Sequence, residues 1–239
     1  MARFQKLIFL LVLTVPAAAE TLVYLGSYTG GESKGIYRST LDETTGELSD
    51  PVLAAELENP SFLVVSPDQN YLFAVSENGK FKGEEGGGVS SFAIGEDGGL
   101  TLINQVNSGG GAPCHISTDP QGKCLLVANY MGGSISSYQI AADGKLVSPA
   151  AGGFIQHEGQ GAQLPRQASP HAHSVNVGPT GKRAYVADLG LDKVLIYKLD
   201  AASGMIVSNA PPFLKLPDAT GPRHFSFHPS GKWAYTNLE

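Results

Sequence analysis

One motif recurs four times along the chain, and this repeat constrains the fold more than any other feature. Each copy begins at a proline, continues with a short alternating run, reaches a second proline in a turn, and ends in a run of aliphatic and aromatic residues. Repeats of this length are typical of architectures built from similar structural units. The units are expected to have boundaries near residues 60, 113, 170 and 222.

Further strands are predicted after each motif. Alternating runs such as Ser134–Ile140 and Lys193–Asp200 are followed by turns rich in Gly and Asp, which is the pattern of antiparallel hairpins. With 30 Gly and 15 Pro in 239 residues, no window supports a long helix after the N-terminal leader. Four-stranded units of this length predict an all-β fold, a β-propeller. A solenoid is the alternative, and it is disfavoured because solenoid repeats are usually shorter.

The two ends of the chain do not complete the repeat. Residues 22–50 contain the later strands of a unit, with the last of them expected at 47–50, but no first strand. Glu239 follows the second strand of the fifth unit, so only three whole units are present. An open arc leaves exposed strand edges. We expect either a truncated form of a longer protein or two chains that complete one ring.

The first 19 residues have the pattern of a signal peptide. Arg3 and Lys6 precede an apolar run, and small residues follow at positions 17–19. The run is too short to span a bilayer. We therefore expect an exported chain, periplasmic or secreted, in which residues 20–239 form the partial propeller without membrane contact. A buried first strand is the alternative.

Composition argues against a nucleic-acid-binding surface and against a disulfide scaffold. The formal net charge is −6, and no block of Lys or Arg occurs. Cys114 and Cys124 are the only cysteines. The expected hairpin places Cys124 opposite about Ser117, so we predict two free, half-buried thiols.

Four segments carry a resemblance to a known family. They are Tyr28-TGGESKGIY, Ala112-PCHISTDPQGKCLLVANYMGGSISSY, Arg166-QASPHAHSVNVGPTGKRAYVADLGLDKVLIYKLD and Gly221-PRHFSFHPSGKWAY. In this order they resemble the lactonase seven-bladed β-propeller family, which includes bacterial 6-phosphogluconolactonases. The resemblance implies seven blades, of which this chain holds roughly the first half to two thirds. It also implies hydrolysis of a sugar lactone, for the named member in the oxidative pentose phosphate route.

Alignment of the units on their turn prolines brings polar residues into three columns. The first column holds Ser61, Cys114, His173 and Arg223, the second holds Phe62, His115, Ser174 and His224, and the third holds Glu77, Tyr130, Leu189 and Glu239. Because the first strands of propeller blades line the central channel, the columns are expected to converge near one mouth. Members of the family usually have Asn-Glu at the end of the third column, whereas this chain has Asn237-Leu238-Glu239.

Lactone hydrolysis needs an activated water, groups that stabilise the oxyanion and residues that bind the substrate. We predict His173 as the general base, assisted by Glu239 or Glu77. Arg223 is predicted to stabilise the oxyanion or to bind an anionic group, because its planar fork matches carboxylate and phosphate. The predicted substrate contacts are His115, His171, Arg166 and Asn129.

Structural roles compete at several of these positions. His224 could be a hydrogen-bonded structural histidine, Arg166 could be solvated, and Asn129 could stabilise a turn. His171 and His173 are two residues apart on a predicted strand, so they should share a face. That spacing could hold a metal, but no third ligand is obvious, and we expect neither a metal nor a cofactor.

Three functions of different classes follow from these features. The first is a lactonase acting on 6-phosphogluconolactone or a related aldonolactone, as a monomer when the protein is full length. The leader argues for an unphosphorylated substrate, because phosphorylated sugars are mainly cytosolic. The second is a non-catalytic propeller that binds a partner or acts as a scaffold. The third is a cyclase related to enzymes that form a muconolactone.

Overall fold

The computed structural model describes residues 21–148 and 152–239, which form strands joined by turns. The predicted signal peptide, residues 1–19, lies outside the described residues. Within the described part of the chain, no helix is long and apolar enough to cross a membrane.

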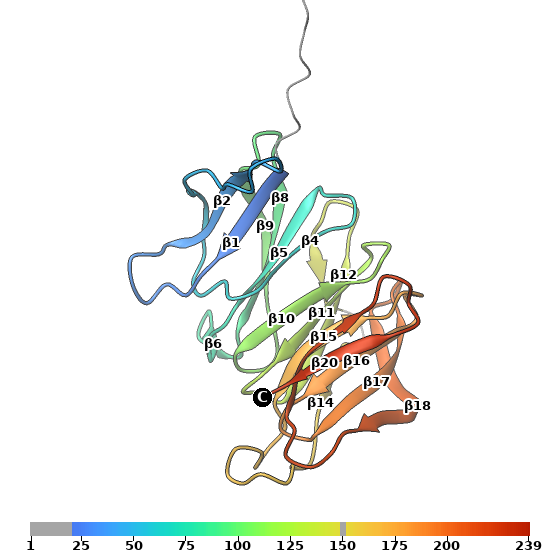
Figure 1. Ribbon diagram of the computed structural model, residues 1–239. Helices are drawn as coiled ribbons and strands as arrows, with labels where there is room; N and C mark the ends of the chain where they lie inside the picture. Colours follow the sequence, from blue (N-terminus) through green and yellow to red (C-terminus); the bar gives the residue numbers. More distant parts are fainter. Residues whose placement is uncertain (1–20, 149–151) are drawn as a thin grey trace, which may run out of the picture.

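Three antiparallel sheets have the meander order of a propeller blade, in which each strand pairs with the next (Figure 1). Two short strands, β6 (Lys80–Phe81) and β7 (Glu84–Glu85), form a separate hairpin, and β14 (Phe154–Gln156) extends the middle sheet beside β12. The three sheets comprise β4 (Leu63–Val65), β5 (Tyr71–Ser76), β8 (Gly88–Ile94) and β9 (Leu100–Asn107); β10 (Pro113–Thr118), β11 (Cys124–Asn129), β12 (Ser134–Ile140) and β13 (Leu146–Val147); and β15 (Ala172–Val177), β16 (Arg183–Asp188), β17 (Lys193–Asp200) and β18 (Met205–Lys215).

Smaller sheets stand before and after these three. The first contains β1 (Thr21–Gly26), β2 (Gly35–Leu41) and β3 (Val52–Glu56), and the last contains β19 (Pro222–Phe227) and β20 (Ala234–Leu238). The third strand of the first sheet was expected at 47–50, and this prediction is wrong. Leu48 makes only an isolated bridge to Leu41, and β3 begins four residues later.

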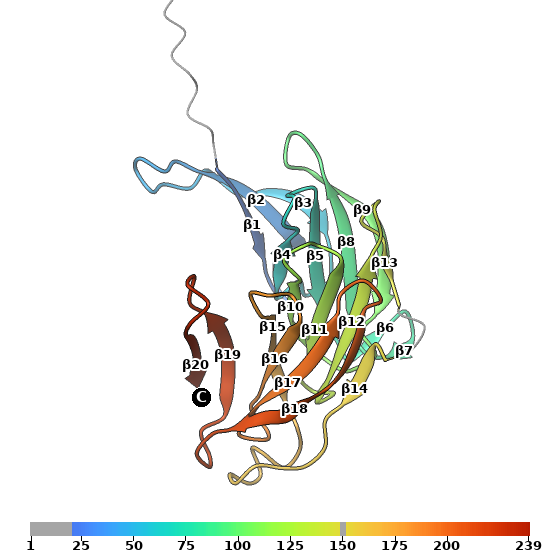
Figure 2. The same ribbon diagram turned by 90° about the vertical axis from the view of Figure 1, so that its right-hand side faces the viewer.

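The sheets fan out around a common axis (Figure 2), and their first strands are neighbours: β4 contacts β10, β10 contacts β15, and β15 contacts β19. The apolar cores lie between adjacent sheets. One such core joins Phe73 and Val75 of β5 to Leu125 and Val127 of β11, and all four are fully buried. Burial on both faces explains why these strands are apolar without interruption.

The proline turn of the repeat fixes the hairpin between the first and second strands of each unit. The third turn residue has a positive φ in all four copies, at Gln69, Gly122, Gly181 and Gly231. Glycine adopts this conformation without a steric penalty, which explains its place in three of the copies. In the second copy the carboxylate of Asp119 also accepts the N–H groups of the residues at positions 121, 123 and 124. The turn therefore sets which strand residues lie at the axis.

Both cysteines are free, and both are buried rather than half-buried. Thr118 pairs with Leu125 and Ser117 with Leu126, so Cys124 lies opposite Asp119 and not opposite Ser117. Cys124 packs between sheets in the same core as Ala172 and Val186.

Candidate functional site

A cavity of about 440 Å³ lies where the first strands of the sheets begin. Its walls combine ionisable, aromatic and small polar side chains from the strands β10, β15 and β19 and from loops next to the strands. The lining residues are Tyr28, Ser61, Phe62, Glu77, Cys114, Tyr130, Arg166, His173, Arg223, His224 and Glu239. All four members of the first predicted column and three members of the third are among them.

Irregularities in the first strands turn the first-column side chains toward the cavity. The register shifts between Pro113 and His115 in β10, and between Ala172 and Ser174 in β15. The residues skipped by these bulges are Cys114 and His173. A β-bulge re-aims a side chain that regular pleating would direct elsewhere. The same local distortion thus brings a thiol and an imidazole to the mouth from different sheets.

The ends of the second strands contribute the carboxylates. Glu239 follows β20 and accepts hydrogen bonds from Arg166 Nε at 3.0 Å and Nη2 at 2.6 Å through one oxygen, Oε1. Its other oxygen, Oε2, lies 3.3 Å from Arg223 Nε. These contacts, led by the hydrogen bond from Arg166, hold the pKa of Glu239 below its ordinary value. Glu239 is therefore ionised and sits between two guanidinium groups.

Glu77, which follows β5 of the second sheet, is the other carboxylate that lines the cavity. Its Oε2 accepts a hydrogen bond from the hydroxyl of Tyr28 at 2.8 Å. Burial first, and this bond second, raise the pKa of Tyr28 above its ordinary value. Tyr28 has no partner among the columns, because it precedes the first aligned unit. The only sequence signal for it was its place in the segment Tyr28-TGGESKGIY.

His173 is 9% exposed and packs between Cys114, Tyr130 and His224. Its Nδ1 lies 4.0 Å from Cys114 Sγ, and its ring centroid lies 5.0 Å from that of His224. Burial, with the positive charge of Arg223 next in importance, lowers the pKa of His173 to about 4. His173 is thus neutral at physiological pH and can accept a proton.

Cys114 does not have the features of a nucleophile. Its Sγ lies 3.3 Å from the His173 carbonyl oxygen, and burial raises its pKa to about 12. The thiolate is the reactive form of cysteine, and its population at neutral pH is therefore very small. Cys114 therefore lines the cavity as a small, polarisable side chain.

Three of the predicted contacts lie outside the lining. His115 is buried beneath the cavity, with its ring centroid 4.2 Å from that of Phe62, and its Nδ1 accepts the N–H of Val175. His171 stacks on Tyr130 at 4.8 Å between ring centroids. The prediction that His171 and His173 share the face of a strand is wrong, because β15 begins only at Ala172 and its register shifts at once.

Asn129 is fully buried at the end of β11, and its amide donates to the Ser108 carbonyl and to Ser134 Oγ. These bonds connect the turn after β11 with the segment after β9. The arrangement matches the turn-stabilising alternative and places Asn129 away from the cavity lining. Its role as a substrate contact stays a prediction.

Arg166 was predicted either as solvated or as a contact at the mouth, and the structure places it at the mouth. Its guanidinium carbon lies 5.7 Å from the centroid of the Tyr130 ring. His224, also left open, lines the cavity, and its backbone N–H donates to Asn237 Oδ1. Among the described residues, no group of three or more His, Cys, Asp or Glu side chains is arranged to hold a metal.

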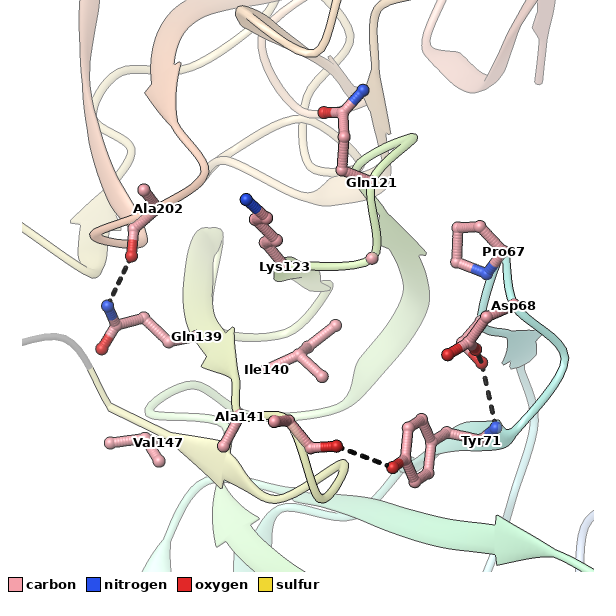
Figure 3. Close-up of a pocket in the computed structure, with 13 residues that line it drawn as sticks. Pro67, Asp68, Tyr71, Gln121, Lys123, Gln139, Ile140, Ala141, Val147 and Ala202 are labelled. Carbon is pink, nitrogen blue, oxygen red and sulfur yellow. Dashed lines mark hydrogen bonds between the residues drawn. The ribbon is translucent and has the colours of Figure 1, made fainter.

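A larger cavity of about 800 Å³ lies at the opposite ends of the first strands, beside the proline turns (Figure 3). Pro67, Gln121 and Lys123 belong to those turns, and Tyr71 donates from its hydroxyl to the Ala142 carbonyl. The smaller cavity is the better candidate site, because ionisable groups with shifted pKa values converge there.

Antiparallel blades around an axis, with polar side chains collected at one end of the inner strands, define a β-propeller with an axial site. Residues 22–239 match the family described as lactonase, 7-bladed beta-propeller. The chain belongs to this family, which confirms both the resemblance and the predicted all-β propeller fold.

Several relatives are similar over most of the chain. The 6-phosphogluconolactonase of Bacillus subtilis strain 168 is 35% identical over 217 residues, which is 90% of this chain and 59% of the relative. The solved structure of a periplasmic gluconolactonase from Pseudomonas aeruginosa superposes with a TM-score of 0.81 at 35% identity, over 92% of this chain and 61% of that one. A Bacteroides fragilis protein proposed to be a 6-phosphogluconolactonase gives a TM-score of 0.86 at 34% identity, over 95% and 63%. The chain thus spans about six tenths of the length of these relatives.

Proposed function

We propose that this chain carries the hydrolytic site of a lactonase that opens a sugar lactone to its hydroxy acid. The single observation that carries the proposal is the position of the neutral His173 beside Arg223 and Glu239 in one cavity. The relatives named as 6-phosphogluconolactonase and as gluconolactonase support the same reaction class.

In the proposed reaction, His173 removes a proton from a water molecule while the water oxygen attacks the carbonyl carbon of the lactone. Negative charge develops on the carbonyl oxygen, and Arg223 is placed to stabilise it. The ring C–O bond then breaks, and the imidazolium returns its proton to the ring oxygen. The product is the open-chain hydroxy acid, and no cofactor is consumed.

The pKa of His173 has two opposite effects on this reaction. A pKa of about 4 keeps the imidazole free of a proton, but it also makes the imidazole a weaker base than one with a pKa near 7. Glu239 favours the protonated form of His173 by its charge, although this effect is smaller than that of burial. We therefore assign Glu239 to the stabilisation of the imidazolium and to the orientation of both arginines.

The charges that line the cavity favour an unphosphorylated aldonolactone over a phosphorylated one. Glu77 and Glu239 balance Arg166 and Arg223, and each arginine already contacts Glu239. A phosphate would have to compete with that carboxylate. An exported protein, which the leader predicts and the periplasmic relative supports, would also meet unphosphorylated sugars.

The experiment measures ring opening of δ-gluconolactone and of 6-phosphogluconolactone by the full protein, above the spontaneous rate. We expect faster opening of δ-gluconolactone and a loss of about 10²-fold or more in kcat for His173→Ala. A full protein with no excess rate on either substrate would favour the binding or scaffold function. Opening of muconolactone, but of neither sugar lactone, would favour the cyclase relatives.

A further inference from the structure

Two buried polar side chains outside the cavity connect the segments that carry its arginines. Gln167 directly follows Arg166 and is 1% exposed, and Asp192 is fully buried in the turn between β16 and β17. Gln167 Nε2 donates to Asp192 Oδ1 at 2.7 Å. Neither side chain lines the cavity. The lactonase mechanism above leaves both of them without a role.

On one side, Gln167 holds the segment before β15. Its Oε1 accepts the N–H of Gln163 at 2.7 Å, and its backbone carbonyl accepts the N–H of Gly161 at 3.0 Å. Its Nε2 also donates to the Leu189 carbonyl at 2.7 Å. Every polar atom of the Gln167 side chain is therefore engaged, and Arg166 is attached to a fixed backbone.

On the other side, Asp192 holds the segment that leads into β19. Its carboxylate accepts the N–H groups of Ala219 at 2.9 Å, Thr220 at 3.0 Å and Gly221 at 2.9 Å. Gly221 stands two residues before Arg223, and its carbonyl accepts the N–H of Glu239 at 3.0 Å. One carboxylate thus fixes the start of β19 and, through Gly221, the end of β20.

The backbone at position 192 indicates that the aspartate is present for its side chain. Asp192 has a φ of 53°, and Gly133, which occupies the same place in the turn of the preceding sheet, has a φ of 56°. This left-handed conformation favours glycine, and an aspartate adopts it only at a cost in conformational energy. The carboxylate makes four hydrogen bonds that the glycine of the preceding sheet could not make.

Glu239 contacts both arginines, but each of these contacts also depends on where the backbone places the arginine. The side chains of Arg166 and Arg223 are 37% and 42% exposed, and long exposed side chains lose conformational entropy when they are fixed. We propose that Gln167 and Asp192 form a buried positioning pair that sets the spacing of Arg166 and Arg223 around Glu239, and thereby the affinity of the site for the oxygen atoms of its substrate. This inference rests on the proposed lactonase function for its kinetic test only.

The kinetic test is a double-mutant cycle with Gln167→Met and Arg166→Met in the full protein, assayed on δ-gluconolactone. Methionine keeps the volume of glutamine and removes its hydrogen bonds. If Gln167 acts through Arg166, Gln167→Met raises KM about 10-fold with little change in kcat, and the double variant has the KM of Arg166→Met alone. Fold-changes in KM that multiply would overturn the proposal, because a purely structural role gives independent effects.

A second test does not depend on catalysis. Hydrogen exchange is measured for the segment 217–223 in Gln167→Met and in Asp192→Asn, which keeps the side-chain shape. Because the pair connects the two segments, we expect exchange there to rise at least several-fold when Gln167 is changed. Unchanged exchange in both variants would overturn the proposal even if the protein proves inactive on every lactone, so the two failures are distinguishable. If Gln167→Met does not fold, Asp192→Asn carries both tests.

The matched control is Asn104→Leu. The Asn104 amide donates to the Leu146 carbonyl at 2.9 Å and accepts the N–H of Leu146 at 3.0 Å, on the outer side of the second and third sheets. Its loss removes two hydrogen bonds that have no connection to either arginine. We expect a lower melting temperature with unchanged KM and unchanged exchange at 217–223. A KM that rises as much as in Gln167→Met would show that any loss of stability produces the effect.

Discussion

His173 carries the clearest chemical consequence of burial. Its pKa of about 4 lies below the ordinary histidine value of about 6.5, because the charged form loses water and faces Arg223. A general base must be unprotonated, so the proposed activity should persist as the pH falls and decline only near pH 4. The measurement is kcat/KM from pH 3.5 to 8, corrected for spontaneous opening. An acid limb near pH 6.5 would contradict this assignment, and the limb should be missing in His173→Ala.

The hydrogen bond between Tyr28 and Glu77 allows a second test of the cavity as the catalytic site. Removal of the Tyr28 hydroxyl leaves Glu77 without its donor, and a hydrogen bond to a charged group contributes about 1.5–3 kcal/mol before solvent exposure is considered. Tyr28 is well exposed, so we expect Tyr28→Phe to lower kcat/KM by about three- to ten-fold. Tyr37→Phe is the control, since that hydroxyl accepts only the N–H of Lys34. Equal losses in both variants would argue against a role for Tyr28 in the site.

At the scale of single elements, the turn at Gly133 combines a left-handed backbone with a close backbone contact. A Cβ at this position would lie 2.6 Å from the Pro170 carbonyl oxygen, and the φ of 56° already disfavours a side chain. We expect Gly133→Ala to cost about 1–3 kcal/mol of unfolding free energy. Gly46→Ala separates the two causes, because Gly46 has a φ of 77° with open space around it. Chemical denaturation measures both, and equal costs would show that the contact with Pro170 is unimportant.

The repeat made much of the fold predictable, and the reason is geometric. Each unit has the same turn, so counting from the turn prolines predicts that Cys114, His173 and Arg223 lie together, and all three line the cavity. The bulges that aim these side chains were not predicted, because a register shift leaves no mark in the alternation of the sequence.

Two parts of the site depend on segments outside the repeat. Tyr28, which was missed, comes from the loop after β1. Arg166, whose place at the mouth was one of two predicted alternatives, comes from a long polar stretch that has no counterpart in the other units. For Asn129, a polar residue at a strand end fits both a ligand and a turn, and only contacts such as its bonds to Ser108 and Ser134 favour the turn. The pattern of residues within one segment does not predict the contacts that this segment makes with segments distant in the chain.

At the scale of the whole molecule, buried neutral histidines connect stability to pH. Burial lowers the pKa of His115 to about 3 and that of His173 to about 4. The unfolded chain takes up these protons near pH 6.5, whereas the folded chain does so only near 3 to 4. Folding stability is therefore complete above about pH 6.5 and declines as the pH falls toward 4.

Thermal unfolding between pH 7 and pH 4 tests this dependence. We expect the melting temperature to fall by several degrees across that range, and to fall less in His115→Gln, which retains an acceptor for the Val175 N–H. Asp42 serves as a reference for the pH range, since its backbone hydrogen bonds lower its pKa and its stabilising effect is lost only as the pH falls below about 4. A melting temperature that is constant from pH 7 to pH 4 would contradict the assigned neutrality of the buried histidines.

The convergence of equivalent positions from successive sheets has a consequence for how this site can change. Ser61, Cys114, His173 and Arg223 occupy the same place in four copies of one unit, yet each is chemically different. Exchange of two of these side chains would therefore move a functional group from one sheet to another around the mouth. Substrate specificity in such a fold can change by substitutions at equivalent positions of the repeated unit, while the strands and turns of that unit stay the same.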